Sequence, residues 1–138
     1  MARVLLALAL AVQAASMPMT VLADAAMSNV DTPRQVIART DAEWDALWRA
    51  HAGDAPRPAV DLSSQMVAAV FLGTRTTGGV SVAVVGTRQD GDGLVVEWTE
   101  RRPAPGQVAP QIITAPAILV ALPRVEGAVR FEKVSGGR

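Results

Sequence analysis

The segment that most constrains the fold is a glycine-punctuated turn between two valine-rich runs. The first run covers residues 66–72, the turn contains Thr77-Gly78-Gly79, and the second run covers residues 80–85. Adjacent glycines supply the positive φ angles that tight turns need, and β-branched residues favour strands. The pattern predicts a β-hairpin, and it contains no reactive group that would indicate catalysis.

Upstream of this turn, the sequence predicts one short strand and one short helix. Residues 35–39 favour a strand, and Thr40 with Glu43 has the spacing of a capping box, which begins a helix. The apolar residues that follow are spaced so that they share one helix face: Trp44, Leu47 and Trp48. With Gly53 as the stop signal, we expect an amphipathic helix over residues 41–51 that buries two tryptophans.

Further strands are expected downstream. The pattern favours strands at 80–88, 94–99, 111–122 and 129–133, with a break or bulge at Pro116, because proline cannot donate to a strand ladder. In the strand at 94–99, Val96, Trp98 and Glu100 would share one face. The predicted fold is α+β and mainly β: a short N-terminal helix packed on an antiparallel meander of about five to six strands, as an open barrel or a sandwich.

The N-terminus has the pattern of a secretory signal peptide. A short basic start is followed by an apolar run over residues 4–15 that only Gln13 interrupts, and it is too short to span a bilayer comfortably. Small or β-branched residues favour cleavage after Ala23 or Ala25. We therefore expect a signal peptide at 1–23, a flexible leader at 24–33 and a single domain at 34–138, with an uncleaved N-terminal anchor as the alternative.

Composition narrows the classes of function. The chain has no cysteine, so disulfides, iron–sulfur clusters and thiolate zinc sites are excluded. Without Arg3, 12 basic and 13 acidic side chains remain, so charge predicts neither nucleic-acid nor membrane-surface binding. We expect no cofactor, no metal, no stable membrane insertion after cleavage, and a periplasmic or secreted bacterial protein.

Few residues are candidates for chemistry. His51 is the only histidine, and no nucleophile motif accompanies it, so we expect it to close the helix as a cation rather than to catalyse. The segment Asp90-Gly91-Asp92-Gly93 lacks the further ligands of a calcium loop and predicts a hairpin turn. Glu100, with Arg101 and Arg102, is expected to form a solvated charge cluster. No catalytic residue is predicted.

Five motifs in this order resemble the C-terminal domain of PrcB-type protease-complex subunits. They are Glu43-Trp44 with Leu47-Trp48, the segment from Pro58 to Leu62, Phe71-Leu72-Gly73 with Thr77-Gly78-Gly79, Pro103 to Gly106, and Thr114 to Pro116. The resemblance covers about residues 35–133. It implies an exported, non-catalytic protein that binds and stabilises a partner protease. The chain departs from the family at Val80, Leu62 and Ala115, where the family has aromatic residues.

The expected meander also predicts a binding surface. Alternate turns of a meander lie at the same end of the sheet, so the turn at 74–79 and the loop at 101–110 should meet there. We expect this end to contact a protein partner, with the proline-stiffened loop preorganised for docking. The candidate partner-binding residues are Arg75, Thr77, Gly78, Gly79, Arg101, Arg102 and Pro103.

Two other functions remain open. A chagasin-like protease inhibitor is the first alternative, because Thr76-Thr77-Gly78 and Arg102-Pro103 are faintly similar to its inhibitory loops. A hydrolase is the second alternative, although the sequence offers no site for it. The favoured function is an exported accessory protein that binds a protease or another envelope protein.

Overall fold

The computed structural model describes residues 17–135, and these form one helix and seven strands. None of its described helices is long and apolar enough to cross a bilayer. In chain order the elements are β1 (Thr20–Ala25), β2 (Arg34–Ala38), α1 (Asp41–Ala52), β3 (Gln65–Phe71), β4 (Ser81–Asp90), β5 (Gly93–Arg101), β6 (Ala117–Pro123) and β7 (Val129–Lys133).

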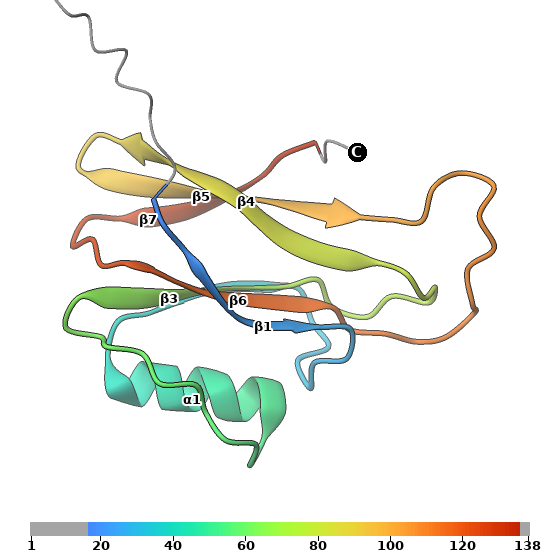
Figure 1. The fold of residues 1–138 in the computed structure, drawn as a ribbon, viewed down its shortest axis with the longest axis horizontal. Coiled ribbons are helices and arrows are strands. Elements are labelled where there is room, and N and C mark those ends of the chain that lie inside the picture. The colour runs from blue at the N-terminus through green and yellow to red at the C-terminus, as the bar shows by residue number, and fades with distance from the viewer. Residues whose placement is uncertain (1–16, 136–138) are drawn as a thin grey trace, which may run out of the picture.

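The strands form two stacked sheets, and the helix covers one of them (Figure 1). The four-stranded sheet has the order β1-β6-β3-β2 with antiparallel neighbours, and the three-stranded sheet has the order β4-β5-β7. The result is a three-layer arrangement of helix, sheet and sheet. The predicted class, α+β and mainly β with a sandwich, is confirmed.

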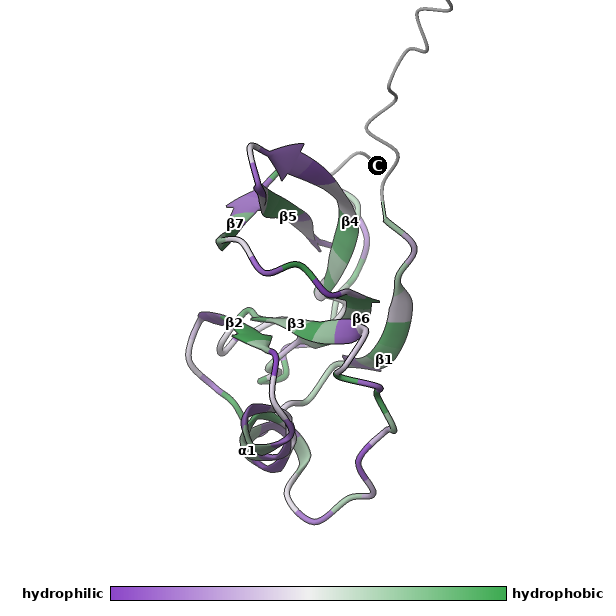
Figure 2. Cartoon of the chain, turned by 90° about the vertical axis from the view of Figure 1, so that its left-hand side faces the viewer, coloured by the Kyte–Doolittle hydropathy of each residue, from purple (hydrophilic) through white to green (hydrophobic). Residues whose placement is uncertain are grey.

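The central strands β3 and β6 are buried on both faces, so each has a continuous apolar sequence rather than an alternating one. In β3, Met66, Ala68 and Val70 face the other sheet and form part of an inner apolar cluster. Val67 and Phe71 face α1 and belong to an outer cluster with the helix tryptophans. Figure 2 shows these layers, with α1 below the four-stranded sheet.

The helix is built as its sequence predicts. The Thr40 hydroxyl accepts a hydrogen bond from the Glu43 amide at 3.1 Å, and the Glu43 carboxylate accepts one from the Thr40 amide at 3.1 Å. Gly53 ends the helix with φ of 61°. Trp44 and Trp48 lie edge to face with ring centroids 5.7 Å apart. Each indole N–H donates to a carbonyl in the segment after the helix, so both rings are buried without an unpaired donor.

The predicted hairpin across Thr77-Gly78-Gly79 is wrong. Strands β3 and β4 do not pair; they lie in different sheets, and residues 72–80 cross from one sheet to the other. Both edges of β3 are already occupied, by β2 and β6, so β4 has no edge to join. Of the two glycines, only Gly79 has a positive φ, of 80°.

The simple meander is also wrong in its connections. β6 joins the four-stranded sheet instead of pairing with β5, and β7 runs parallel to β5. The hairpin predicted at Asp90–Gly93 is confirmed, since Asp90 pairs with Gly93 at the end of β4 and β5. The break at Pro116 is confirmed as well, because β6 begins at Ala117.

Residues 24–33 differ from the flexible leader that we expected. Asp24 and Ala25 complete β1, which pairs with β6, and Ser28 and Val30 are buried. This order depends on contacts with α1 and with β6, which lies far along the chain, so no local pattern indicates it. Residues 1–16 of the predicted signal peptide lie outside the described residues.

Candidate functional site

Two long connections meet at one end of the sandwich, which we call the loop end: residues 72–80 and residues 102–116. β4 begins and β5 ends there, with Ser81 paired to Arg101 (Figure 1, right). The Gly78 amide donates to the Pro110 carbonyl at 2.8 Å and so joins the two connections. The predicted meeting of these segments is confirmed, although they meet between two sheets rather than within one.

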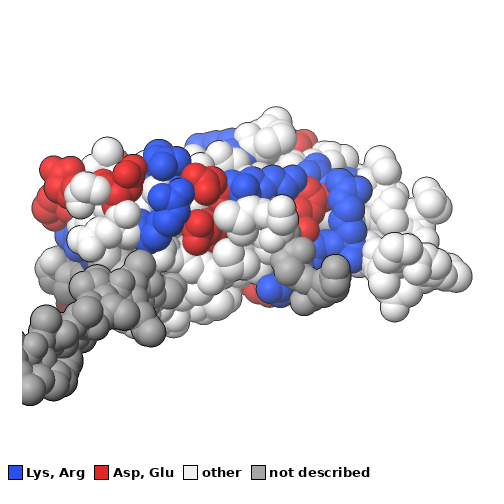
Figure 3. Space-filling view, turned by 90° about the horizontal axis from the view of Figure 1, so that it is seen from above, with Lys and Arg blue, Asp and Glu red and all other residues white. Residues whose placement is uncertain are grey.

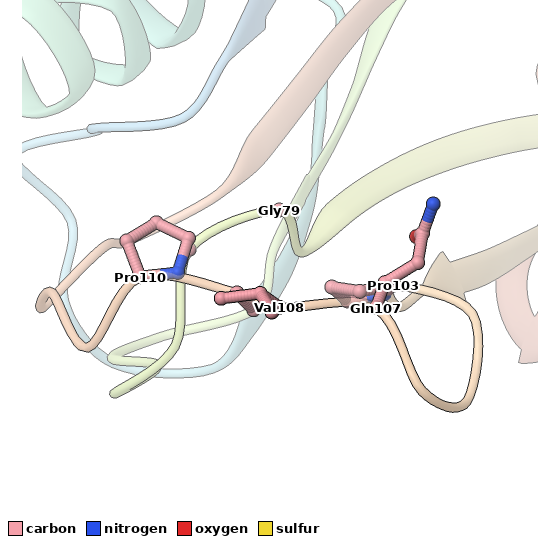
Figure 4. A pocket seen from close by; sticks show the side chains of 7 residues that line it. Gly79, Pro103, Gln107, Val108 and Pro110 are labelled. Carbon is pink, nitrogen blue, oxygen red and sulfur yellow. The ribbon is translucent and has the colours of Figure 1, made fainter.

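The glycines of the loop end allow this close approach. A Cβ on Gly78 would lie 2.7 Å from Cγ of Pro110, and one on Gly79 would lie 2.9 Å from Cγ of Pro103. Figure 4 shows the prolines beside this glycine backbone. The surface is hollowed here by about 340 Å³, lined by Gly78, Gly79, Pro103, Gln107, Val108, Ala109 and Pro110.

Behind the loops lies a buried carboxylate surrounded by cations. The Glu100 side chain is only 4 % exposed, and its oxygens accept hydrogen bonds from Nε and Nη2 of Arg75 at 2.9 and 3.1 Å. Arg102 Nη2 lies 3.0 Å and Lys133 Nζ 3.4 Å from the same carboxylate. The hydrogen bond from Arg75 lowers the pKa of Glu100 to about 2, despite the burial that opposes it. The carboxylate therefore stays charged across the physiological range.

Arg75 acts inside the structure. Its Nη1 donates to the carbonyls of Leu72 and Thr74, and its backbone exchanges two hydrogen bonds of 2.8 Å with Thr114. The side chain therefore joins residues 72–80 to β5, and the backbone of Arg75 joins them to the second connection at Thr114. The solvated cluster predicted for Glu100 is wrong. In β5, Glu100 lies on the same face as Val96, which belongs to the inner apolar cluster. The predicted strand alternation had already placed these two residues on one face.

The outer part of the loop end is apolar and exposed. Val108 is 99 %, Ile113 68 % and Ile112 51 % exposed. In the space-filling view this tip is a white, uncharged projection beyond a surface of interleaved acidic and basic side chains (Figure 3, right). Exposed apolar residues gathered in one place are typical of interaction surfaces.

Comparison with known proteins concerns the same part of the chain. Residues 66–123 match the family described as PrcB C-terminal, and this range runs from β3 through both connections to β6. We call this range the PrcB C-terminal segment. The family is that of a protease-complex subunit, which indicates an accessory role related to such a complex. No curated protein and no solved structure matches the chain.

The PrcB C-terminal segment contains all seven predicted partner-binding residues, and the structure brings them together at the loop end. Their exposure divides them into two groups. Arg101 and Arg102 are exposed, whereas Gly78 is buried and the Arg75 side chain is bound by Glu100. The apolar tip residues Val108, Ile112 and Ile113 are not among the predicted partner-binding residues. A run of apolar residues between prolines was the signal that could have indicated them.

His51 lies outside the PrcB C-terminal segment and is a core residue. It is 6 % exposed, and its Nδ1 lies 2.7 Å from Oγ of Ser28, which is 8 % exposed. Its ring packs against Trp48 and Phe71. Burial lowers the pKa of His51, so the expected cationic helix cap is wrong. Ser28 Oγ also accepts from the Val30 amide, so this pair fastens the segment after β1 to the helix.

The remaining candidates have structural partners. Asp90 forms an ion pair with Arg130 at 3.2 Å beside the β4–β5 turn. Glu97 pairs with Arg88 at 3.3 Å on the outer face of the three-stranded sheet. Across residues 17–135, no group of three or more histidine, cysteine, aspartate or glutamate side chains is placed to hold a metal ion.

Proposed function

We propose that this chain is an exported, non-catalytic accessory protein that binds a partner, an exported protease or another envelope protein, through the loop end. The match of residues 66–123 to the PrcB C-terminal family supports the protease-related role. The single observation that carries the choice of surface is the exposed apolar tip, with Val108 99 % and Ile113 68 % exposed. Removal of apolar surface from water is the main favourable contribution to most protein–protein association.

The construction of the loop end supports this choice. The Gly78–Pro110 hydrogen bond joins its two connections and the Arg75–Glu100 ion pair joins the first of them to β5, so these contacts would restrict the tip before binding. A preorganised loop loses less conformational entropy when it docks. Arg101 ends β5 and Arg102 begins the connection that carries the tip, and both are exposed, so they would supply polar contacts at this end.

The test is a photo-crosslinking experiment on the full-length chain in the exporting cell. A photoreactive amino acid replaces Val108 at the tip or, as a matched control, Val85, which is 44 % exposed in the β4 bulge away from the tip. We expect a crosslinked species at 108 that mass spectrometry identifies as an exported protein, and none at 85. Equal crosslinking at both positions, or none at 108, would contradict the proposal.

Two variants then separate the apolar and basic contributions. Val108→Asp with Ile113→Asp should abolish the crosslinked complex, because it places charge where an apolar contact is expected. Arg101→Ala with Arg102→Ala should weaken the complex and reduce its dependence on salt. Val85→Asp is the control that should leave the complex intact.

A chagasin-like inhibitor is the second candidate, and one observation favours it. The segment Thr76-Thr77-Gly78 and the pair Arg102-Pro103 lie at the same end, where a Cβ on Gly79 would lie 2.9 Å from Cγ of Pro103. Inhibition of papain-like proteases by the purified chain, lost in the Val108→Asp, Ile113→Asp variant, would select this candidate. Absence of inhibition together with a retained complex would select the accessory protein.

A further inference from the structure

Residues 17–25, which we call the strap, close one side of the sandwich. Its β1 part pairs with β6 from Thr20 opposite Ala121 to Ala25 opposite Ala117. Before β1, the Met17 amide donates to Oγ1 of Thr87 in β4 at 3.1 Å, so the strap reaches from one sheet to the other. Figure 2 shows β1 and the preceding chain rising along this side toward β4.

The strap contributes to both apolar clusters of the molecule. Met17 and Met19 pack against the inner cluster between the sheets, and Leu22 and Ala23 pack against the outer cluster under the helix. Burial of such side chains stabilises the folded chain in proportion to the apolar area removed from water. The strap is therefore part of the folded domain and not a leader to it.

The cleavage sites expected from the sequence conflict with this arrangement. A cut after Ala23 removes four of the six residues of β1, and a cut after Ala25 removes all of them. The edge of β6 would then lose its partner along the strand and expose a row of backbone donors and acceptors. Both apolar clusters would also be opened to water on that side.

A second group of small residues stands directly before the strap. After the basic start and the apolar run at 4–12, Gln13 is followed by Ala14-Ala15-Ser16. A segment of this kind, with a basic start, an apolar run and a small-residue end, has the features of a signal peptide. We infer that signal peptidase cuts between Ala14 and Met17 and that the mature protein keeps all of β1. This inference depends on the proposed export.

N-terminal sequencing of the exported protein tests the inferred cleavage site. The full-length chain with a C-terminal tag is expressed in an exporting bacterium, recovered from the periplasm or medium, and sequenced from its N-terminus. A first residue between Ala15 and Met17 supports the inference, and any later one, Asp24 or Ala26 above all, overturns it. A chain that begins at Met1 also overturns it; if that chain is cytoplasmic, the proposed export fails with it.

Two matched variants identify the site used. Ala14 stands directly before a cut after residue 14 and at the third position before a cut after Ser16, so Ala14→Leu blocks both. A cut after Ala15 would have the large polar Gln13 at that third position, which departs from the small-residue pattern of signal-peptidase sites. Ala23 has the same two positions for cuts after Ala23 and Ala25, so Ala23→Leu blocks those. In a pulse-labelling experiment, which does not depend on folding, we expect only Ala14→Leu to accumulate as precursor. Accumulation of Ala23→Leu instead would overturn the inference.

A thermal unfolding measurement on the exported protein tests the strap itself. Leu22→Asp places a charge against the outer cluster, whereas Val21→Asp changes a side chain that is 56 % exposed on the same strand. We expect Leu22→Asp to lower Tm by about 5 °C or more, or to prevent folding, and Val21→Asp to leave it nearly unchanged. A Tm of Leu22→Asp equal to that of the wild type would show that the mature protein does not use the strap.

Discussion

Glu100→Gln is the substitution that tests the internal electrostatics of the loop end. Glutamine keeps the shape of the side chain and removes its charge, so packing is preserved while the ion pairs with Arg75, Arg102 and Lys133 are lost. The carboxylate is 4 % exposed and accepts two hydrogen bonds from Arg75, so its charge interacts strongly with that guanidinium.

The expected magnitude follows from the pKa of Glu100. A fall of this pKa from 4.5 to about 2 means that the folded state prefers the charged carboxylate by about 3 kcal/mol. Glu100→Gln should therefore lower the free energy of unfolding at neutral pH by about 2–3 kcal/mol, since the amide still accepts one hydrogen bond from Arg75. For a domain of this size, that change corresponds to a Tm lower by about 10 °C.

Urea unfolding at several pH values is the assay. The folded pKa lies below the unfolded one, so the stabilisation by Glu100 is complete above about pH 5 and is lost as the pH falls from 4.5 toward 2. The wild type and Glu100→Gln should differ fully at pH 7 and converge in this range, because protonated glutamate is as neutral as glutamine. Glu126→Gln, which removes a carboxylate that is 78 % exposed, is the control and should match the wild type at pH 7.

Two results would refute the reasoning. A difference that is the same at pH 7 and pH 2.5 would mean that the substitution acts through packing and not through charge. A difference below about 1 kcal/mol at pH 7 would mean that water screens this carboxylate as it screens surface ion pairs.

Three further predictions concern the helix, the loops and the core histidine. Thr40→Ala removes the hydroxyl that caps α1 and should cost about 1 kcal/mol in chemical unfolding; an unchanged midpoint would mean that the cap adds nothing. Gly79→Ala should lower Tm more than Gly106→Ala, because both glycines have positive φ but only Gly79 lies against Pro103. An equal fall in Tm would mean that backbone strain alone, and not the contact with Pro103, causes the loss of stability. Burial lowers the pKa of His51, so wild-type stability should fall as the pH drops below about 6.5, and His51→Gln should remove this slope; an identical slope would show that another group titrates.

Local signals determined the elements that the sequence analysis predicted well. The capping box, the tryptophan spacing and Gly53 act within a few residues of each other, so helix α1 follows from them directly. The Asp-Gly turn between β4 and β5 and the break at Pro116 are equally local. Strand alternation placed Glu100 on one face with Val96 and Trp98, but we expected it to be solvated, because its burial beside Arg75 and Lys133 depends on distant segments.

Local sequence signals could not determine which strands pair with each other. Thr77-Gly78-Gly79 has the composition of a hairpin turn, yet β3 has partners on both edges that come from residues 34–38 and 117–123. The strap at 17–25 resembles the end of a signal peptide because small and β-branched residues serve both roles. The exposure of Val108 likewise depends on the tertiary structure, because it requires that no other segment packs over this residue.

The sequence by itself therefore determined the helix, the tight turns, the strand-forming segments and the resemblance to the PrcB C-terminal family, because each depends on residues close together or on ordered motifs. Only the tertiary structure decided which strands share a sheet, that Glu100 and His51 are buried, and that the strap belongs to the core. These properties depend on the burial of surfaces contributed by segments far apart in the chain, which no local pattern specifies.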